Sequence, residues 1–541
     1  MNGTLTNSYG YDAASNRTSF TDPAGGTSNY TYDTLNRLTN LEDFNSANFG
    51  FGYDALGRRT SLTRPNGVDT SYSYDNLSRL LSVLHNGGTL PGSTSYVVDA
   101  AGNRTSKTAL QQADPNPVSV TSNYTYDNIY QLTQAVVGGN LAESFTYDAV
   151  GNRLTSVDPA SYTYNSSNQL TSTSAATYTY DYNGNTTSKT DTNGTTYYTW
   201  DYENRLTSVT LPGQGGTVHF NYDPFGRRIR KALGSATTIY AYDGDNMVEE
   251  LDSSGNIVAH YTQGAGIDEP LAMYRGLTTS YFHADGLGSI TSLTDGSGQL
   301  AASYVYDSFG KLTASTGTIA NPFRYTGREF DSETGLYYYR ARYYDGTAGR
   351  FLSEDQNKNG SPQSLYLYVD NSPAQLTDPF GMQAQSPLLV GTWTPQQTSQ
   401  LTAGWVEALN RLKDSSCRKL FCNKHHKLDP DDLLRKTQYE IQILSNGAGA
   451  ATMASTLVYI NPAGQFFQMS TTAYIPYDKP ELSGMRSVQF GSVADLTAFI
   501  LLHELGHQVG IFGADLFGFI NGGHSLRVLD ACFKKGVKVG D

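Results

Sequence analysis

Aromatic residues alternate with Thr, Ser, Asn and Gly in short runs over about the first two thirds of the chain, and many of these runs end in Tyr-Asp. An alternation with a period of two predicts β-strands that bury one face. The Asp-x-x-Gly or Asp-x-x-Asn sequence that follows is typical of a turn that tolerates a positive φ. The first four of these aspartates, Asp12, Asp33, Asp54 and Asp75, stand 21 residues apart. We therefore predict one β-hairpin in each unit.

The pattern continues less regularly after these four copies. Later copies have their aspartate at Asp127, Asp148, Asp181, Asp201, Asp223, Asp243 and Asp307. A single hairpin buries too little surface to be stable, but an array can stack its aromatic rings into a continuous seam. The composition of 54 Gly, 40 Tyr and only 16% charged residues also favours strands and tight turns. The predicted fold is mostly β, an array of hairpins.

Two segments at the end of the repeats carry a family resemblance. They are NPFRYTGREFD at 321–331, with the Tyr-rich run that follows it, and Asp378-Pro-Phe-Gly-Met382. Together with the repeats they resemble the YD repeats and associated core of RHS proteins and of Tc-toxin C components. The resemblance implies that residues 1–320 coil into a β-shell and that 321–382 form the RHS-associated core, with a toxin cargo after it. Because the chain opens inside a repeat, we expect further repeats before Met1.

The core of RHS shells resembles an aspartyl autoprotease that cuts just after the terminal signature. Two carboxylates that share a proton can activate water, because close like charges separate their pKa values. The matching positions are Asp355 and Asp378, with Arg350 as a charge partner. The resemblance places the scissile bond at Met382–Gln383. Asp370 remains an alternative for the second carboxylate, since sequence spacing does not choose between the two.

The chain changes character after the signature. Residues 383–400 are polar and contain Pro, which indicates a linker, and residues 401–541 are predicted to form a small α+β domain. Apolar spacing predicts a helix over Leu401–Leu409. Strands are predicted at Thr437–Leu444, Thr456–Ile460 and Thr472–Ile475.

The candidate chemistry of this domain lies in the sequence HELGH. On a helix, His503 and His507 are neighbours on one face and can bind one Zn²⁺ ion. Glu504 lies beside them, where it can act as general base and then general acid on the metal-bound water. The motif resembles that of gluzincin and metzincin zinc peptidases, which implies a zincin-like metallopeptidase. Two candidates for the third zinc ligand remain open, Asp515 and His524.

Charge and cysteine content limit the possible partners. The net charge is −13, and in residues 383–541 the 14 Lys and Arg barely outnumber the 13 Asp and Glu. Neither part has the basic excess typical of nucleic-acid binding, so nucleic acid is not an expected partner. Three cysteines cannot form a disulfide scaffold, although Cys532 could pair with Cys417 or Cys422 in an oxidising compartment. No signal peptide follows Met1, so any export signal would lie upstream.

We therefore predict a secreted or cell-surface RHS-family toxin, whose repeat shell carries a zinc peptidase and releases it by self-cleavage. Its expected partners are an immunity protein, a protein or peptide substrate in a target cell, and a secretion-system component. One alternative is a YD-repeat adhesion protein that contacts surface glycans through exposed Tyr and Asn and has a non-catalytic C-terminal domain. Another is a zinc amidase that acts on the cell wall.

Overall fold

The computed structural model describes residues 6–88, 92–112, 117–356 and 364–382, together with seven short strands after residue 388. Within these ranges the regular structure consists of β-strands and two 3-10 turns, and no helix there is long and apolar enough to cross a membrane. The expected mostly β fold is confirmed. The chain divides into two compact units, the first of which contains residues 1–55 and 59–383.

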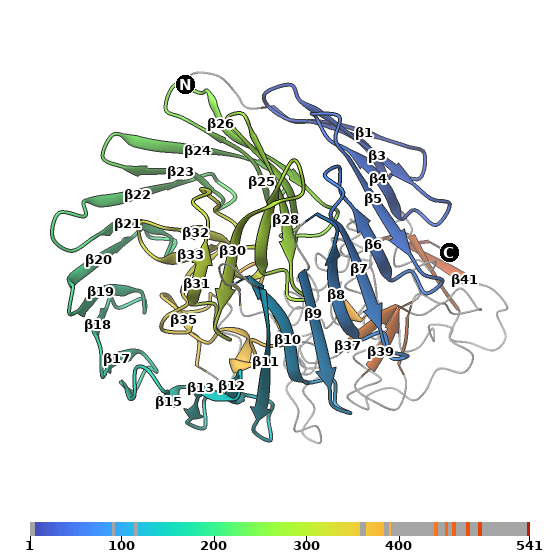
Figure 1. Ribbon diagram of the computed structural model, residues 1–541. Helices are drawn as coiled ribbons and strands as arrows, with labels where there is room; N and C mark the ends of the chain where they lie inside the picture. The colour runs from blue at the N-terminus through green and yellow to red at the C-terminus, as the bar shows by residue number, and fades with distance from the viewer. Residues whose placement is uncertain are drawn as a thin grey trace. The chain divides into compact units, whose positions relative to one another are not determined.

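The first unit contains two large antiparallel sheets, in which every strand pairs with its neighbours in the sequence (Figure 1). The first sheet contains β1 (Ser8–Tyr11), β2 (Arg17–Thr21), β3 (Thr27–Tyr32), β4 (Leu38–Glu42), β5 (Asn48–Tyr53), β6 (Arg59–Thr63), β7 (Asp69–Tyr74), β8 (Leu80–Asn86), β9 (Gly92–Val98), β10 (Arg104–Gln112), β11 (Pro117–Tyr126), β12 (Leu132–Val137) and β13 (Asn140–Ser144). A two-stranded sheet of β14 (Thr146–Tyr147) and β15 (Arg153–Thr155) follows.

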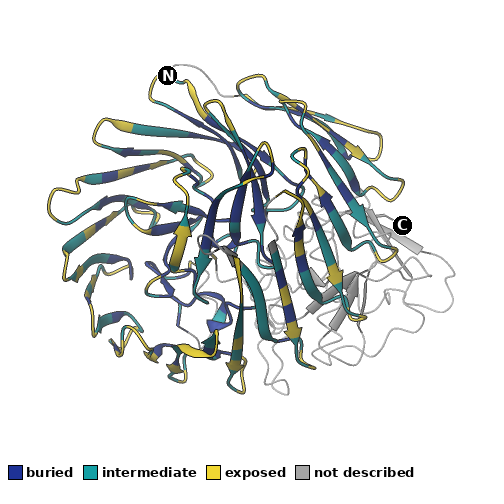
Figure 2. Ribbon diagram, viewed as in Figure 1, coloured by how far each residue is buried: buried dark blue, intermediate teal, exposed yellow. Residues whose placement is uncertain are grey.

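The second large sheet continues the same hairpin order. It contains β16 (Tyr162–Tyr164), β17 (Leu170–Thr173), β18 (Thr177–Tyr180), β19 (Thr186–Asp191), β20 (Gly194–Trp200), β21 (Leu206–Thr210), β22 (Thr217–Tyr222), β23 (Arg228–Leu233), β24 (Ala236–Asp243), β25 (Asn246–Leu251), β26 (Ile257–Gln263), β27 (Pro270–Arg275), β28 (Thr278–Ala284), β29 (Ile290–Asp295), β30 (Leu300–Tyr306) and β31 (Leu312–Thr316). Buried and exposed residues alternate along strands such as β3 and β22 (Figure 2), as the period of two predicts, whereas β25 to β28 are buried over runs of four or five residues.

The aspartate of each Tyr-Asp pair closes its own turn. Asp33 accepts hydrogen bonds from the backbone N–H groups of Leu35 and Arg37, at 2.9 and 3.0 Å, while the Arg37 side chain binds its other oxygen at 2.7 Å. Between them Asn36 adopts a φ of +60°, which Asn tolerates better than most residues. The turn therefore favours a side-chain oxygen acceptor at its start and Asn or Gly three residues later, which explains the recurrent Asp-x-x-Asn/Gly sequence, although Ser15 and Tyr130 adopt the same positive φ.

The tyrosine of each pair joins its hairpin to the preceding one. The Tyr32 hydroxyl donates a hydrogen bond to the carbonyl of Arg17, which lies 15 residues earlier, at 3.0 Å. The same bond recurs from Tyr53 to Leu38, from Tyr74 to Arg59 and from Tyr147 to Leu132. A buried hydroxyl without a partner would be costly, so these bonds allow the rings to be packed between successive repeats.

The two large sheets contact each other through residues far apart in the sequence. A single buried cluster contains Phe20, Leu41 and Phe49 of the first sheet together with Val248 and Leu271 of the second. Polar bonds follow the same path, including those of Arg17 with Asp243, Asp43 with Thr262, Asn66 with Thr294 and Lys107 with Asp285. The two large sheets therefore share a buried cluster and are joined by polar contacts along their length.

The segment after the repeats forms a small sheet that packs on the second large one, and the residues after the small sheet reach β10 of the first. It contains β32 (Glu329–Asp331), β33 (Leu336–Tyr339), β34 (Arg342–Asp345) and β35 (Arg350–Phe351). All residues of β33 and β34 are buried. The 3-10 turns are η1 (Tyr325–Gly327) and η2 (Val369–Asn371). The Asn371 side chain donates to the carbonyl of Gly151, while Ala374 accepts a hydrogen bond from Arg104 of β10.

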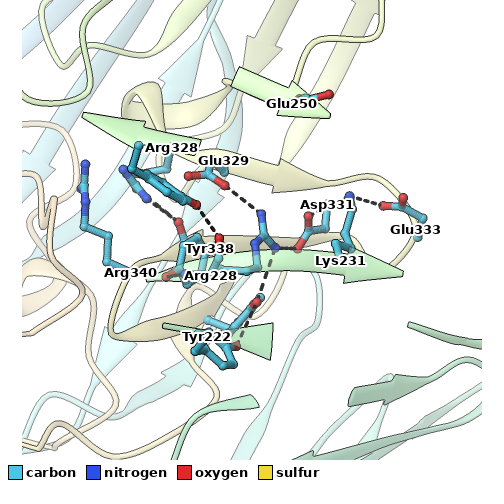
Figure 3. Close-up of polar contacts among 12 residues, drawn as sticks. Tyr222, Arg228, Lys231, Glu250, Arg328, Glu329, Asp331, Glu333, Tyr338 and Arg340 are labelled. Atoms are coloured by element: carbon cyan, nitrogen blue, oxygen red, sulfur yellow. Dashed lines mark hydrogen bonds and ion pairs between the residues drawn. The ribbon is translucent and has the colours of Figure 1, made fainter. Parts of the chain in front are cut away.

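A buried charge network anchors β32 to the second large sheet (Figure 3). The guanidinium of Arg228, on β23, contacts Glu329 at 2.8 Å and also pairs with Asp331. Lys231 binds Asp331 and Glu333, both at 3.0 Å. Arg228 is only 1% exposed, so the carboxylates neutralise a charge that water cannot reach.

In the second unit the structure describes β36 (Leu389–Val390), β37 (Gln438–Ile441), β38 (Ala450–Thr452), β39 (Leu457–Ile460), β40 (Thr472–Pro476), β41 (Met485–Gln489) and β42 (Lys538–Gly540). Three of these, β37, β39 and β40, coincide with the strands predicted after residue 436. The strand β37 pairs in parallel with β36 and β39. The predicted helix at Leu401–Leu409 lies outside the described residues.

Candidate functional site

Two buried carboxylates meet at one guanidinium at the end of the first unit. Nη2 of Arg342, on β34, lies 3.2 Å from Oδ2 of Asp355 and 3.5 Å from Oδ2 of Asp378. The three side chains are at most 4% exposed. The guanidinium also lies 3.6 Å above the ring of Phe351, which keeps it oriented towards both carboxylates. The arrangement is an acidic pair held together by a single positive charge.

The environment of Asp378 favours its protonated form. Burial, reinforced by the nearby charge of Asp355, raises the pKa of Asp378 to about 6, although Arg342 acts in the opposite direction. A carboxyl with this pKa can hold a proton under mildly acidic conditions and give it up in a reaction. A carboxyl group that holds a proton beside a second carboxyl group is the arrangement used by acidic pairs in acid–base catalysis.

The backbone of the terminal signature is hydrogen-bonded to this cluster of charged side chains. Nε of Arg342 donates a hydrogen bond to the carbonyl of Gly381 at 2.5 Å, and the N–H of Met382 donates to Oδ1 of Asp378 at 3.2 Å. Both partners belong to the Gly381–Met382 peptide group. The Gly381–Met382 peptide group, one residue before the predicted scissile bond, is thus bound by the same Arg342 and Asp378 that form the charge cluster.

Several features fix the signature in this position. The Arg340 guanidinium binds the carbonyl of Pro379 and pairs with Asp268 at 2.7 Å. Gly381 has a φ of +62°, and a Cβ there would lie 2.2 Å from the carbonyl oxygen of Tyr339. Only glycine combines this backbone conformation with such a close approach to β33. The Gly of Asp-Pro-Phe-Gly is therefore required by local sterics.

The structure brings together some of the residues predicted for self-cleavage and corrects one. Asp355 and Asp378 share Arg342, whereas Asp370 lies in η2 with a φ of +51° and is not among the described partners of that guanidinium. Arg350 was predicted as the charge partner, but the arginine that pairs with both carboxylates in the described ion pairs is Arg342. The Arg350 guanidinium lies between the rings of Tyr164 and Tyr366, 5.2 and 4.9 Å from their centres.

Sequence reasoning missed Arg342 although a signal was present. It stands between Tyr339 and Tyr343 in a Tyr-rich strand segment, where a buried charged side chain needs a buried partner.

Other candidate residues lie outside the described part of the chain. These are Gln383 of the scissile bond, the zinc-site residues His503, Glu504 and His507, and the third-ligand candidates Asp515 and His524. The zinc ion and its ligand set stay predictions.

Comparison with known proteins identifies the repeats. The teneurin YD-shell family matches residues 106–373, and the RHS repeat family matches residues 53–90. The tRNA nuclease WapA of Bacillus subtilis (strain 168) is 35% identical over 273 residues, which cover 47% of this chain and 12% of that protein. Double-stranded DNA deaminase toxin A of Burkholderia cenocepacia (strain H111) is 28% identical over 274 residues, covering 44% and 19%.

A solved structure supports the same fold. The crystal structure of TcdB2-TccC3-Cdc42 superposes with a TM-score of 0.60 at 21% identity, and the match covers 71% of this chain and 22% of that one. This similarity establishes the shared architecture of the shell. The chain spans only about an eighth to a fifth of the length of the two curated relatives above.

The relatives correct the predicted enzyme class. They are named as a tRNA nuclease and a DNA deaminase, which contradicts the expectation of a zinc peptidase. These names also weigh against the expectation that nucleic acid is not a partner of this chain, which rested only on the balance of charged residues. The repeat pattern, the strand order and the family matches agree with one another. The chain therefore carries a YD-repeat shell of the RHS family.

Proposed function

We propose that this chain is a toxin shell that cleaves itself after Met382 and so separates the shell from its C-terminal segment, residues 383–541. The observation that carries the proposal is the convergence of Asp355, Asp378 and Arg342 on the backbone of the terminal signature. Arg228 also pairs with two buried carboxylates, so the feature particular to Arg342 is its contact with the signature backbone. Asp378 also binds the Met382 N–H, which brings the carboxyl pair next to the proposed scissile bond.

The proposed reaction is hydrolysis by a proton-sharing carboxyl pair. Asp355 takes a proton from a water molecule, whose oxygen attacks the carbonyl carbon of Met382. Asp378 donates its proton to the departing amine of Gln383, so a carboxylic acid and a new amine form as the peptide bond breaks. Arg342 holds both carboxylates and the preceding carbonyl, which fixes the peptide beside the reacting groups before the reaction begins.

Substitution of each carboxylate by its amide tests this assignment. Asp355→Asn and Asp378→Asn keep the side-chain shape and should each leave the full-length chain intact, whereas the unsubstituted chain yields two fragments. Asp370→Asn is the matched control, because Asn tolerates the positive φ of that residue and the chain should still cleave. Mass spectrometry of the fragments identifies the bond. Cleavage that persists in both carboxylate variants would exclude the mechanism.

For the released segment we propose a toxic activity on nucleic acid. Support comes from the relatives, which are named for acting on tRNA and on double-stranded DNA. Induced expression of the full chain in a bacterial host should stop growth, and the host's tRNA and DNA are then examined for cleavage or deamination. Intact, unmodified nucleic acid in arrested cells would exclude this substrate class. We also propose a cognate immunity protein, whose co-expression should restore growth, and export through a secretion system.

A further inference from the structure

A second cluster of ionisable groups lies far from the self-cleavage site, where the two large sheets meet. Asp22 follows β2 in the first sheet, while Glu249 and His260 lie on the paired strands β25 and β26 of the second. One potential ligand atom from each side chain lies within 4.8 Å of the other two. Asp22, Glu249 and His260 are 3%, 0% and 7% exposed, so solvent water does not stabilise their charges.

The hydrogen bonds of the cluster leave one acceptor unused. Oδ2 of Asp22 lies 2.9 Å from Nε2 of His260, and Oδ1 accepts the N–H of Gly26 at 2.8 Å. Oε1 of Glu249 accepts the N–H of Ala24 at 3.2 Å, but its buried Oε2 has no hydrogen-bond partner. A buried carboxylate oxygen without a donor is unfavourable unless a proton or a cation occupies the space beside it.

The charges of the three buried side chains also favour a bound cation. Within the described ranges the only ion pair of Asp22 is with His260, and none is formed by Glu249. Two carboxylates are therefore buried together with a single imidazole and no Lys or Arg paired to either. A divalent cation would neutralise both and fill the unused coordination position.

The surroundings hold each side chain towards the others. The His260 ring stacks on Phe44 with ring centres 3.5 Å apart and an interplanar angle of 6°. A Cβ on Gly26 would lie 2.5 Å from Oδ2 of Asp22 and 2.9 Å from Cβ of Phe44, so only glycine leaves room for this approach. The ligand set is thus positioned by packing, with limited freedom to turn away.

We propose that Asp22, Glu249 and His260 bind one divalent transition-metal ion, with Zn²⁺ as the probe. One imidazole nitrogen and two carboxylate oxygens suit Zn²⁺, whose bonds to them are about 2.0–2.2 Å long. Oδ2 of Asp22 and Nε2 of His260 now lie 2.9 Å apart, so their hydrogen bond would open slightly as both atoms turn to the ion. The ion would join the first repeats to the second large sheet and stabilise the folded shell, because it binds the folded chain only.

The competing explanation is a shared proton. In that case Glu249 is protonated and donates a hydrogen bond to Asp22, with no metal involved. The two explanations differ in their response to Glu249→Gln. The amide can replace the carboxylic acid as a donor without loss, but it removes one negative ligand from a metal.

The test uses the full chain with His503→Ala and His507→Ala, so that the HELGH sequence contributes no zinc. After dialysis against Zn²⁺ and then metal-free buffer, zinc content and the thermal midpoint are measured with and without chelator. We expect this doubly substituted parent chain to retain about one equivalent of zinc, and we expect chelator to lower its thermal midpoint. Glu249→Gln should bind no zinc, and the chelator should not change its midpoint. Glu143→Gln, a control at a half-buried carboxylate outside the cluster, should behave like the parent.

Zinc X-ray absorption on the parent keeps the proposal testable even if Glu249→Gln does not fold. A first shell of nitrogen and oxygen with a single imidazole supports the site. Absence of zinc from the parent, retention of zinc by folded Glu249→Gln, or a shell containing sulfur or several imidazoles would each overturn the proposal.

Discussion

The rate of self-cleavage should fall as the pH rises, because the proposed acid is a carboxyl group with a pKa near 6. Burial and the charge of Asp355 keep the proton on Asp378 to a higher pH than usual. At its pKa the group is half protonated, and each further pH unit lowers the protonated fraction about tenfold. The fraction is then about 1% at pH 8, so we expect cleavage to be about 50-fold slower at pH 8 than at pH 6.

The assay begins with the intact chain recovered unfolded from inclusion bodies, since Asp355 and Asp378 are apart until the shell forms. The chain is refolded by dilution at a series of pH values from about 5.5 to 8.5, and samples are stopped in detergent at timed intervals. Far-UV circular dichroism follows refolding independently, so that a slow folding step is not mistaken for slow cleavage. The Asp378→Asn variant provides the uncleaved baseline at every pH.

The direction in which the cleavage rate changes with pH tests whether Asp378 is the acid. A rate that declines through pH 6 and follows the protonated fraction supports Asp378 as the acid. A rate that stays constant to pH 8, or rises with pH while refolding is complete, would refute it.

Three further predictions concern stability and the signature turn. Arg228→Met removes the arginine paired with buried Glu329 and leaves Asp331 with Lys231, which should cost about 3–5 kcal/mol and lower the calorimetric midpoint. Asp307 has a pKa raised to about 7 by burial, so its ionisation destabilises the fold increasingly from about pH 4 to 7. Asp307→Asn should therefore raise the midpoint at pH 8 but not at pH 4. Gly381→Ala places a Cβ against Tyr339 and should slow cleavage while the repeats remain folded by circular dichroism.

The local structure of the repeats was predictable because it depends on neighbouring residues. The alternation of aromatic and small polar residues fixes strand faces, and Asp33 closes a turn with groups no more than four residues away. The tyrosine bond to the previous hairpin spans 15 residues and repeats with the sequence. The sequence also indicated Asp355 and Asp378, through a resemblance to a family signature. Its prediction of a zinc peptidase was wrong, because a short motif does not determine the reaction of a domain.

Only the tertiary structure decided which charged groups share a site. Arg342 rather than Arg350 joins the acidic pair because the packing of β34 and β35 sends one guanidinium to Phe351 and the other to Tyr164. Likewise, the sequence around Asp22 resembles that of the other aspartates that close turns, and Asp22 does bind the backbone of its own turn. Its second oxygen faces a histidine more than two hundred residues later. Short-range patterns set the hairpins, but the pairing of the two sheets depends on how the whole array coils, which no local sequence specifies.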